Sequence, residues 1–257
     1  MTNQHARSAS TGAWPSRVLL TLLCATLSAC GDDDAAVSHD AGRDAHANDD
    51  HDAASSADRD SGVGASDAKL SFFVTSDTSP TGALGGLVGA DARCAKLAKA
   101  VGAAAKTWHA YLSVEKNTDG DAVNARDRIG KGPWYNAKGA LLAEDLDALH
   151  ARNGDAELFL DEHGDKINGQ WSGSPAPVEH DVLTGSNGDG TLLSGKTCAD
   201  WTSEAASSMA QVGHTDGLGP NQNANPPYSS WNSAHANGGC DNTKPLGGAG
   251  RLYCFAL

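Results

Sequence analysis

Hydrophobic residues divide the 257-residue chain into three regions. A short apolar run covers residues 18–27, and short apolar segments recur from Lys69 onward. Between them, residues 31–68 contain no aromatic residue, no Leu and no Ile. Such a segment cannot bury enough apolar surface to offset the entropy cost of ordering it. The pattern therefore predicts a processing signal over residues 1–29, a disordered linker over residues 30–68 and one folded domain over residues 69–257.

Three segments at the start of the predicted domain show the period of a strand or a helix. Residues 70–75 are rich in β-branched and aromatic side chains and predict a strand. Residues 89–102 place apolar side chains at helical spacing, with Asp91 in the expected first turn and Gly102 at the expected C-cap. Residues 108–114 alternate between apolar and polar, which predicts a half-buried strand.

Later segments are shorter and less regular. A second helix is predicted over residues 143–150 and a final strand over residues 251–257. Residues 203–237 show little periodicity and much Gly, Asn, Ser and Pro, which predicts a long irregular region. Because long loops on a fixed scaffold commonly carry function, this region is where we expect a binding site.

The N-terminal apolar run has the features of an export signal. It follows Arg7 and Arg17, and its length is half of the roughly 20 residues that span a bilayer. The sequence Leu27-Ser28-Ala29-Cys30 after it resembles the bacterial lipobox, which implies cleavage before Cys30 and acylation of the Cys30 sulfur. An ordinary secretory signal with an incidental cysteine is the alternative.

Acylation would hold the mature chain at a membrane, because two or three acyl chains anchor a protein far more firmly than one. We therefore expect a cell-envelope lipoprotein, at the outer membrane or cell surface rather than the inner membrane, with the leaflet left open. Residues 31–68 carry eleven Asp, no Glu and two Arg, a net charge of −9, and would act as a spacer of roughly 35 Å. Three histidines among these aspartates, His39, His46 and His51, offer a metal-chelating alternative to a solvated linker.

Charge excludes one class of partner. The whole chain carries a formal charge of −13, which disfavours binding to nucleic acid. Aromatic residues make up only 5% of the chain, which is little for one hydrophobic core, so covalent cross-links are expected to contribute to stability.

Four cysteines remain after Cys24 leaves with the signal and Cys30 is acylated. Cys94, Cys198, Cys240 and Cys254 allow three pairings by counting alone. Disulfides are the expected state of exported cysteines, and the lack of a Cys-x-x-Cys pair argues against zinc.

The segments around these cysteines carry a family resemblance. They read FVT at 73–75, GALGGLVGADARC at 82–94, WHAYLS at 108–113, GPWY at 132–135, WSG at 171–173, DGT at 189–191, CADWTS at 198–203 and LYCF at 252–255. In this order they resemble a family of bacterial exported domains of unknown function, which is itself similar to endostatin and to the C-type-lectin-like fold. The resemblance implies an α+β domain with short helices, small antiparallel sheets and long loops. It also implies two nested disulfides, Cys94 with Cys254 and Cys198 with Cys240.

Calcium-dependent sugar binding is the sharpest site that this resemblance suggests. The nearest matches to the calcium motifs of C-type lectins are Gly219-Pro220-Asn221 and Trp231-Asn232-Ser233, and each lacks an expected oxygen ligand. Ca²⁺ takes six to eight oxygen ligands. The candidate ligand-binding residues are Asp216, Asn221, Asn223, Trp231, Asn232 and Asp241. Packing beside Cys240 is the alternative role for Trp231, and no cofactor other than a possible calcium ion is expected.

The sequence lacks the motifs of several other kinds of functional site. Endostatin's zinc-binding histidines have no counterpart before Phe72, and a domain of charge −6 with five Arg is a poor partner for heparin. The nucleophile elbow, the zinc-protease helix and the phosphate-binding loop are all missing from the sequence. The loop that begins at Asn117 lacks the turn glycine and terminal Glu of an EF-hand, and residues 161–164 predict a solvated hairpin turn. The domain's six histidines are scattered, at positions 109, 150, 163, 180, 214 and 235.

Together these features predict a lipid-anchored envelope protein with a non-catalytic, C-type-lectin-like binding domain. Residues 184–242 would form the binding loops, and the ligand would be a glycan or an envelope or extracellular protein. A protein-interaction module without sugar binding is the alternative, and a hydrolytic enzyme is a weaker one.

Overall fold

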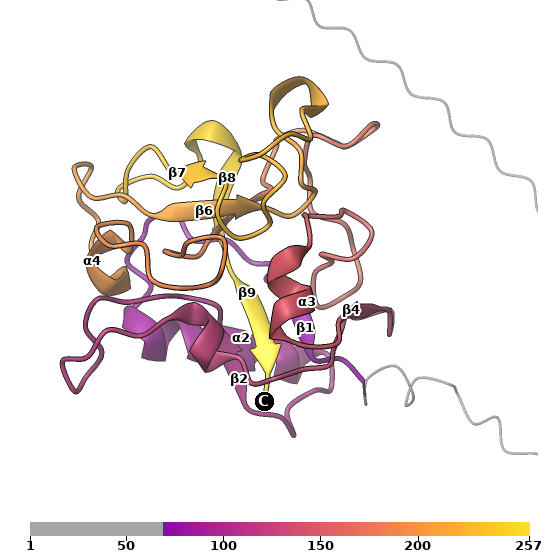
Figure 1. The fold of residues 1–257 in the computed structure, drawn as a ribbon, viewed down its shortest axis with the longest axis horizontal. Helices are drawn as coiled ribbons and strands as arrows, with labels where there is room; N and C mark the ends of the chain where they lie inside the picture. Colours follow the sequence, from indigo (N-terminus) through magenta and orange to yellow (C-terminus); the bar gives the residue numbers. More distant parts are fainter. Residues whose placement is uncertain (1–68) are drawn as a thin grey trace, which may run out of the picture. The chain divides into compact units, whose positions relative to one another are not determined.

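The computed structural model describes residues 69–257 (Figure 1). The predicted signal peptide, the lipidated Cys30 and the acidic linker lie outside the described residues. The described chain is an α+β fold of short helices, small sheets and two disulfides. Its elements are β1 (Phe72–Val74), α2 (Gly86–Ala100), β2 (Trp108–Ala110), β3 (Trp134–Tyr135), β4 (Leu141–Ala143), α3 (Leu146–Ala151), β5 (Asp181–Leu183), α4 (Cys198–Trp201), β6 (Gln211–His214), β7 (His235–Ala236), β8 (Gly248–Arg251) and β9 (Tyr253–Ala256). Single 3-10 turns cover Ala125–Arg128, Pro220–Gln222 and Pro245–Gly247.

The first sheet joins the two ends of the domain. Its strand order is β1-β9-β2, and both pairings are antiparallel. The strands predicted at residues 70–75 and 251–257 are both confirmed, and the structure places them side by side, with Phe73 opposite Cys254. Helix α2 contacts β2, and the Cys94–Cys254 disulfide ties this helix to the central strand of the sheet.

Helix α2 begins earlier than its apolar spacing predicts. It starts at Gly86, so Asp91 lies beyond the first turn, contrary to the prediction. The Asp91 carboxylate instead accepts a hydrogen bond from the Ala110 amide at 2.8 Å and pairs with Arg128 at 2.6 Å, which fixes the helix against β2. The predicted stop is confirmed: Gly102 has a φ of +84°, and the amide of Ala103 donates to the carbonyl of Ala98, as in a Schellman motif.

The alternating segment after α2 is a strand only in its first half. β2 ends at Ala110, and the polar positions Tyr111 and Ser113 are as fully buried as their apolar neighbours. The prediction of a half-buried strand over residues 108–114 is therefore wrong beyond Ala110. The reason is that the chain leaves the sheet and enters the core, where the Ser113 hydroxyl bonds to that of Ser186.

A second sheet takes two of its four strands, β6 and β7, from the region predicted to be irregular. Its order is β7-β6-β5-β8, with β8 parallel to β5 and the other pairs antiparallel, so the sheet is mixed. All four residues of β6 are buried. The prediction of a long irregular region over residues 203–237 is thus wrong for β6 and β7. Gly213 is one reason why β6 lacks the side-chain pattern of a strand. Only glycine fits there, because a Cβ at this position would lie 1.9 Å from the carbonyl oxygen of Trp231.

Two apolar clusters fill the domain. One surrounds both disulfides and includes Trp201, and the other is largely aromatic and includes Trp231. Trp231 packs against the rings of Tyr111, Phe159 and Tyr253. Its predicted position beside Cys240 is therefore wrong, because that cysteine belongs to the other cluster.

The inner disulfide is next to an unusual turn. Cys198 and Cys240 are 42 positions apart, and Cys94 and Cys254 are 160 apart, so the bridges are nested as the resemblance implies. The four residues of α4 all have positive φ, from 49° to 65°. The turn is held in place by the Asp200 carboxylate, which accepts from the Glu115 amide at 2.6 Å.

Two predicted turns also take definite structures. Asn117 Oδ1 accepts from the amides of Asp119 and Asp121 in a tight exposed turn. An antiparallel bridge between Leu160 and Lys166 confirms the hairpin turn at residues 161–164. This turn is not solvated as predicted, because Glu162 is buried and accepts from the amide and hydroxyl of Ser76.

Among residues 69–257, no helix combines the length and the apolar composition needed to cross a membrane.

Candidate functional site

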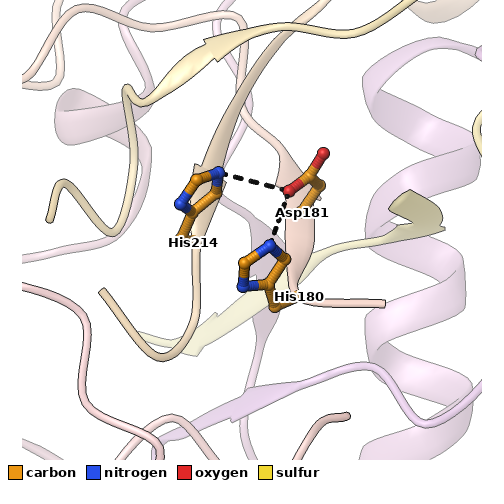
Figure 2. A group of neighbouring side chains, drawn as sticks. All are labelled: His180, Asp181 and His214. Atoms are coloured by element: carbon orange, nitrogen blue, oxygen red, sulfur yellow. Dashed lines mark ion pairs between the residues drawn. The ribbon is translucent and has the colours of Figure 1, made fainter. Parts of the chain in front are cut away.

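Strand register brings polar side chains from distant parts of the chain together. Asp181 on β5 lies directly opposite His214 on β6, and His180 immediately precedes Asp181. β7 pairs with the other edge of β6 and begins with His235. Figure 2 shows His180 and His214 pointing ring nitrogens at the same carboxylate oxygen of Asp181. We call these four residues, His180, Asp181, His214 and His235, the histidine–aspartate cluster.

The cluster is compact. The Nε2 atoms of His180 and His214 each lie 3.3 Å from Oδ1 of Asp181, and Nε2 of His235 lies 3.6 Å from Oδ2. Ligand atoms of His180, Asp181 and His214 all lie within 4.8 Å of one another. Ligands bound to one tetrahedral zinc ion at about 2.1 Å are separated by about 3.4 Å. The nitrogen–oxygen separations of the cluster therefore match the edges of such a tetrahedron.

Each imidazole of the cluster is oriented by a hydrogen bond at its other nitrogen. Nδ1 of His180 donates to the Asp216 carboxylate at 2.7 Å. Nδ1 of His214 donates to the Tyr228 carbonyl at 3.0 Å, and Nδ1 of His235 donates to the Ala236 carbonyl at 3.0 Å. A neutral imidazole that carries its proton on Nδ1 has a lone pair on Nε2, and metal-binding histidines are usually held in this way. All three Nε2 atoms face Asp181.

Burial leaves the centre of the cluster without hydrogen bonds. Asp181 is 2% exposed, and neither of its carboxylate oxygens has a hydrogen-bond partner; the same is true of Nε2 of His214. A buried polar atom without a partner costs roughly 1–3 kcal/mol, and a charged one more. Native proteins accept this cost at functional sites, including sites that bind an ion.

The pKa values of two cluster residues reflect this burial. Burial raises the pKa of Asp181 to about 6, although the neighbouring His180 and His235 act in the opposite direction. Burial, reinforced by His180 and His235, lowers the pKa of His214 to about 3. His214 is therefore a neutral imidazole at neutral pH, which is the form that binds a metal.

Asp216 is the charged group behind the cluster. Burial acts to raise its pKa, but the hydrogen bond from His180 and those from the amides of Gln170 and Leu218 lower the pKa overall. Gly169 leaves room for this carboxylate, because a Cβ there would lie 2.2 Å from Oδ2 of Asp216. Ionised Asp216 thus supports the Nδ1 proton of His180.

Close backbone approach also shapes the cluster. Gly247 has a φ of +105°, and a Cβ at this position would lie 3.3 Å from Nε2 of His180. Only glycine adopts this backbone conformation without strain. The turn at Pro245–Gly247 therefore packs directly on the face of one candidate ligand.

A cavity of about 270 Å³ reaches the cluster. Its lining contains no Asp, Glu, Lys or Arg, and consists of Gln170, His180, His214, Pro220, Tyr228, His235, Ala236 and Leu246. His235 is the most accessible member of the cluster, with 26% of its side chain exposed, whereas His180, Asp181 and His214 are almost fully buried. The three imidazoles therefore form one wall of the cavity.

The six residues predicted to bind ligand do not act as one set. Asp216 is buried beneath the cluster, and its oxygens accept from His180, Gln170 and Leu218. Asn221 and Asn223 lie on the loop beside the cavity, where the Gly219 amide donates to the Asn223 carbonyl. Asp241 is exposed near the inner disulfide.

The remaining two predicted residues belong to the core. Trp231 is fully buried, and its indole nitrogen donates to the Leu149 carbonyl. Asn232 is 1% exposed, and its amide donates to the Tyr111 hydroxyl and to the carbonyls of Asn187 and Gly188. Both side chains are buried and hydrogen-bonded within the core, and a role for them in ligand binding stays a prediction.

The sequence pattern did not reveal the cluster. Three of the six scattered histidines converge, whereas His109 and His150 bond within the scaffold and His163 is exposed. The available signal is a pair of ionisable residues, His180 and Asp181, directly before the apolar Val182 and Leu183, which is an unusual start for a buried strand.

Comparisons with known proteins add no assignment. No protein-family model matches the chain, and no curated protein matches its sequence. The case for a function therefore rests on the geometry of the histidine–aspartate cluster and on the sequence features outside the described domain.

Proposed function

We propose that this domain binds one divalent transition-metal ion, best fitted by Zn²⁺, at the histidine–aspartate cluster. His180 Nε2, Asp181 Oδ1 and His214 Nε2 would hold the ion, with His235 beside them. The observation that carries the proposal is the buried Asp181 carboxylate, which lacks a hydrogen-bond partner and faces three imidazole nitrogens. An ion there would satisfy the carboxylate and the Nε2 lone pairs together.

The ligand set favours a transition metal over calcium. Ca²⁺ selects six to eight oxygens, whereas imidazole nitrogen with one carboxylate suits zinc and its neighbours in the first transition row. The oxygens of Asp216, a predicted calcium ligand, already accept three hydrogen bonds. We therefore assign the metal site to the histidines, and calcium becomes the comparison ion in its test.

The setting of this site is part of the proposal. The lipobox at Cys30 and the acidic segment after it support a lipoprotein that holds its domain away from a bacterial membrane. A C-type-lectin-like fold is supported by the pairing of β1 with β9 and by the nested bridges. Within this setting the domain binds rather than catalyses, and its partner is a glycan or an envelope or extracellular protein.

Metal binding is tested by competition with a chromophoric zinc chelator on the purified full-length chain. One zinc ion per chain is expected at an affinity that outcompetes the dye, with calcium binding far more weakly. Asp181→Asn with His214→Gln should reduce the affinity at least 100-fold, because it removes two of three ligands. The matched control is His163→Gln, since His163 is an exposed histidine outside the cluster.

The linker histidines need their own control. A triple variant of His39, His46 and His51 to Ala removes the alternative chelating segment. If this variant loses the ion and the cluster variant keeps it, the proposed site is wrong.

Anchoring and recognition are tested separately. Radiolabelled palmitate should enter the wild-type chain and not Cys30→Ala.

A glycan array probed with zinc-loaded, calcium-loaded and metal-free protein should give a saturable signal if the partner is a glycan. If no glycan on the array gives a signal and cross-linking captures one envelope protein, the protein-interaction alternative is favoured.

A further inference from the structure

The cavity beside the histidine–aspartate cluster has a different character from the cluster itself. Its other walls are Gln170, Pro220, Tyr228, Ala236 and Leu246, none of which is charged. The Tyr228 ring lies nearly parallel to that of His214, with 6.0 Å between centroids. The lining therefore combines an apolar surface with one amide and one phenol, as small-molecule sites commonly do.

The geometry of the cluster leaves one coordination position toward this cavity. The Nε2 atoms of His180 and His214 converge at Oδ1 of Asp181, whereas His235 approaches the other oxygen, Oδ2. Zinc sites with three protein ligands keep a fourth position for water or for an exogenous ligand. The three imidazoles line the cavity and Asp181 does not, so an ion bound between them would present that position to the cavity.

The net charge at the proposed metal site indicates which class of ligand the cavity would bind. A Zn²⁺ ion and its direct ligands, one carboxylate and neutral imidazoles, would carry a net charge of +1; ionised Asp216 lies behind His180, outside the cavity lining, and the lining itself offers no Asp, Glu, Lys or Arg. One monoanionic group would neutralise this charge, whereas a doubly charged anion such as a phosphate monoester would find no second cation there. The side-chain amide of Gln170 lies in the same lining and can donate to the second oxygen of a carboxylate.

Leu246 marks where the rest of the ligand would lie. It is 65% exposed and has a φ of +67°, an uncommon conformation for a bulky residue. Asn221 and Gln222, which follow the lining residue Pro220, also have positive φ. Strained residues of this kind cluster at ligand sites. An exposed leucine held in a strained turn beside a metal position is suited to cover an apolar group.

We propose that the cavity binds a small monocarboxylate with an apolar body, whose carboxylate takes the metal's open position and whose body packs against Leu246 and Tyr228. This inference rests on the proposed metal site. It names a ligand class that neither the lectin resemblance nor the calcium motifs suggest.

The test uses the full-length chain loaded with Co²⁺, whose visible spectrum reports its coordination. Acetate and butyrate are titrated in turn, and butanol serves as the uncharged control. Both carboxylates should change the spectrum, and butyrate should bind about tenfold more tightly because two further methylene groups are buried. Butanol should leave the spectrum unchanged.

A matched pair of variants locates the apolar contact. Leu246→Asn should remove most of the preference for butyrate without altering acetate or cobalt binding, and asparagine tolerates the positive φ. Val88→Asn is the control, because Val88 is 73% exposed and is absent from the cavity lining. It should leave the tenfold preference intact.

The possible failures are distinguishable. If cobalt binds and no carboxylate changes its spectrum, the cavity proposal is overturned while the metal site stands. Equal affinity for acetate and butyrate, or an unchanged preference in Leu246→Asn, contradicts the apolar contact. If no cobalt binds, the proposed metal site itself is wrong.

Discussion

The imidazole of His180 connects two carboxylates: Nδ1 lies 2.7 Å from Oδ1 of Asp216, and Nε2 lies 3.3 Å from Oδ1 of Asp181. One contact is a hydrogen bond, and the other is not, because the Asp181 oxygen has no hydrogen-bond partner. The two carboxylates therefore have different roles. Asp216 orients the ring, and Asp181 is the carboxylate proposed to bind the metal ion.

Asp216→Asn should lower zinc affinity by about 10–100-fold, which is typical of losing a carboxylate that supports a metal-binding histidine. A neutral amide would no longer increase the basicity of the His180 ring. Competition with a zinc-binding dye measures the change, and Asp241→Asn is the matched control because Asp241 is exposed. Unchanged affinity in Asp216→Asn would mean that this carboxylate serves only the scaffold.

Asp181→Asn should weaken zinc binding and at the same time stabilise the metal-free domain. Burial raises the pKa of Asp181 from 3.8 to about 6, so the folded chain holds this proton more tightly than the unfolded chain does. The cost of the ionised carboxylate is absent below about pH 4 and complete above about pH 6. At pH 7.5 the variant should gain about 3 kcal/mol in the free energy of unfolding.

Urea unfolding in the presence of a chelator measures this gain. The difference between wild type and Asp181→Asn should disappear at pH 4, and added zinc should reverse its sign at pH 7.5. A variant that is less stable than the metal-free wild type at pH 7.5 would contradict the account.

The two disulfides should contribute unequally to stability. Replacing Cys198 and Cys240 by Ser opens a loop of 42 positions and should cost about 4 kcal/mol, and opening the 160-position loop between Cys94 and Cys254 should cost about 5 kcal/mol. Denaturant unfolding of both double-serine variants measures these losses. A larger loss from the inner bridge would show that local packing outweighs loop entropy.

Ala199→Gly should stabilise the domain by about 1 kcal/mol, because Ala199 is exposed and has a φ of +50°, where a Cβ is unfavourable. The same change at Ala95, an exposed position within α2, should destabilise by about 1 kcal/mol. Thermal and urea unfolding compare the two variants. Destabilisation at both positions would mean that the turn at α4 does not carry the expected strain.

His150 should make part of the stability dependent on pH. Burial lowers its pKa below 6.5, and in the folded domain Nδ1 donates to the Leu146 carbonyl while Nε2 accepts from the Tyr111 hydroxyl. As the pH falls below 6.5 the unfolded chain binds this proton first, so the stability contributed by neutral His150 is present above pH 6.5 and is lost below it.

The comparison is with His150→Gln, which does not titrate at this position. The difference in free energy of unfolding between wild type and variant should be largest at pH 7.5 and smaller at pH 5. A constant difference across this range would show that His150 has the same pKa in both states.

Local patterns in the sequence were enough to predict β1, the end of α2 and β9. The helical spacing around Cys94, the stop at Gly102 and the apolar runs of β1 and β9 depend on neighbouring residues, so they can be read without knowing the fold. The two cysteine pairs followed from the family resemblance rather than from spacing, and the structure contains both.

The histidine–aspartate cluster was decided by tertiary structure alone. Its residues meet only because β6 pairs with β5 on one side and with β7 on the other, and the sequence around β6 shows no strand period. A single-residue shift of that register would turn His214 away from Asp181. Chain-local preferences determine helices and turns, but the pairing of distant strands depends on the packing of the whole domain, and the candidate metal site exists only through that pairing.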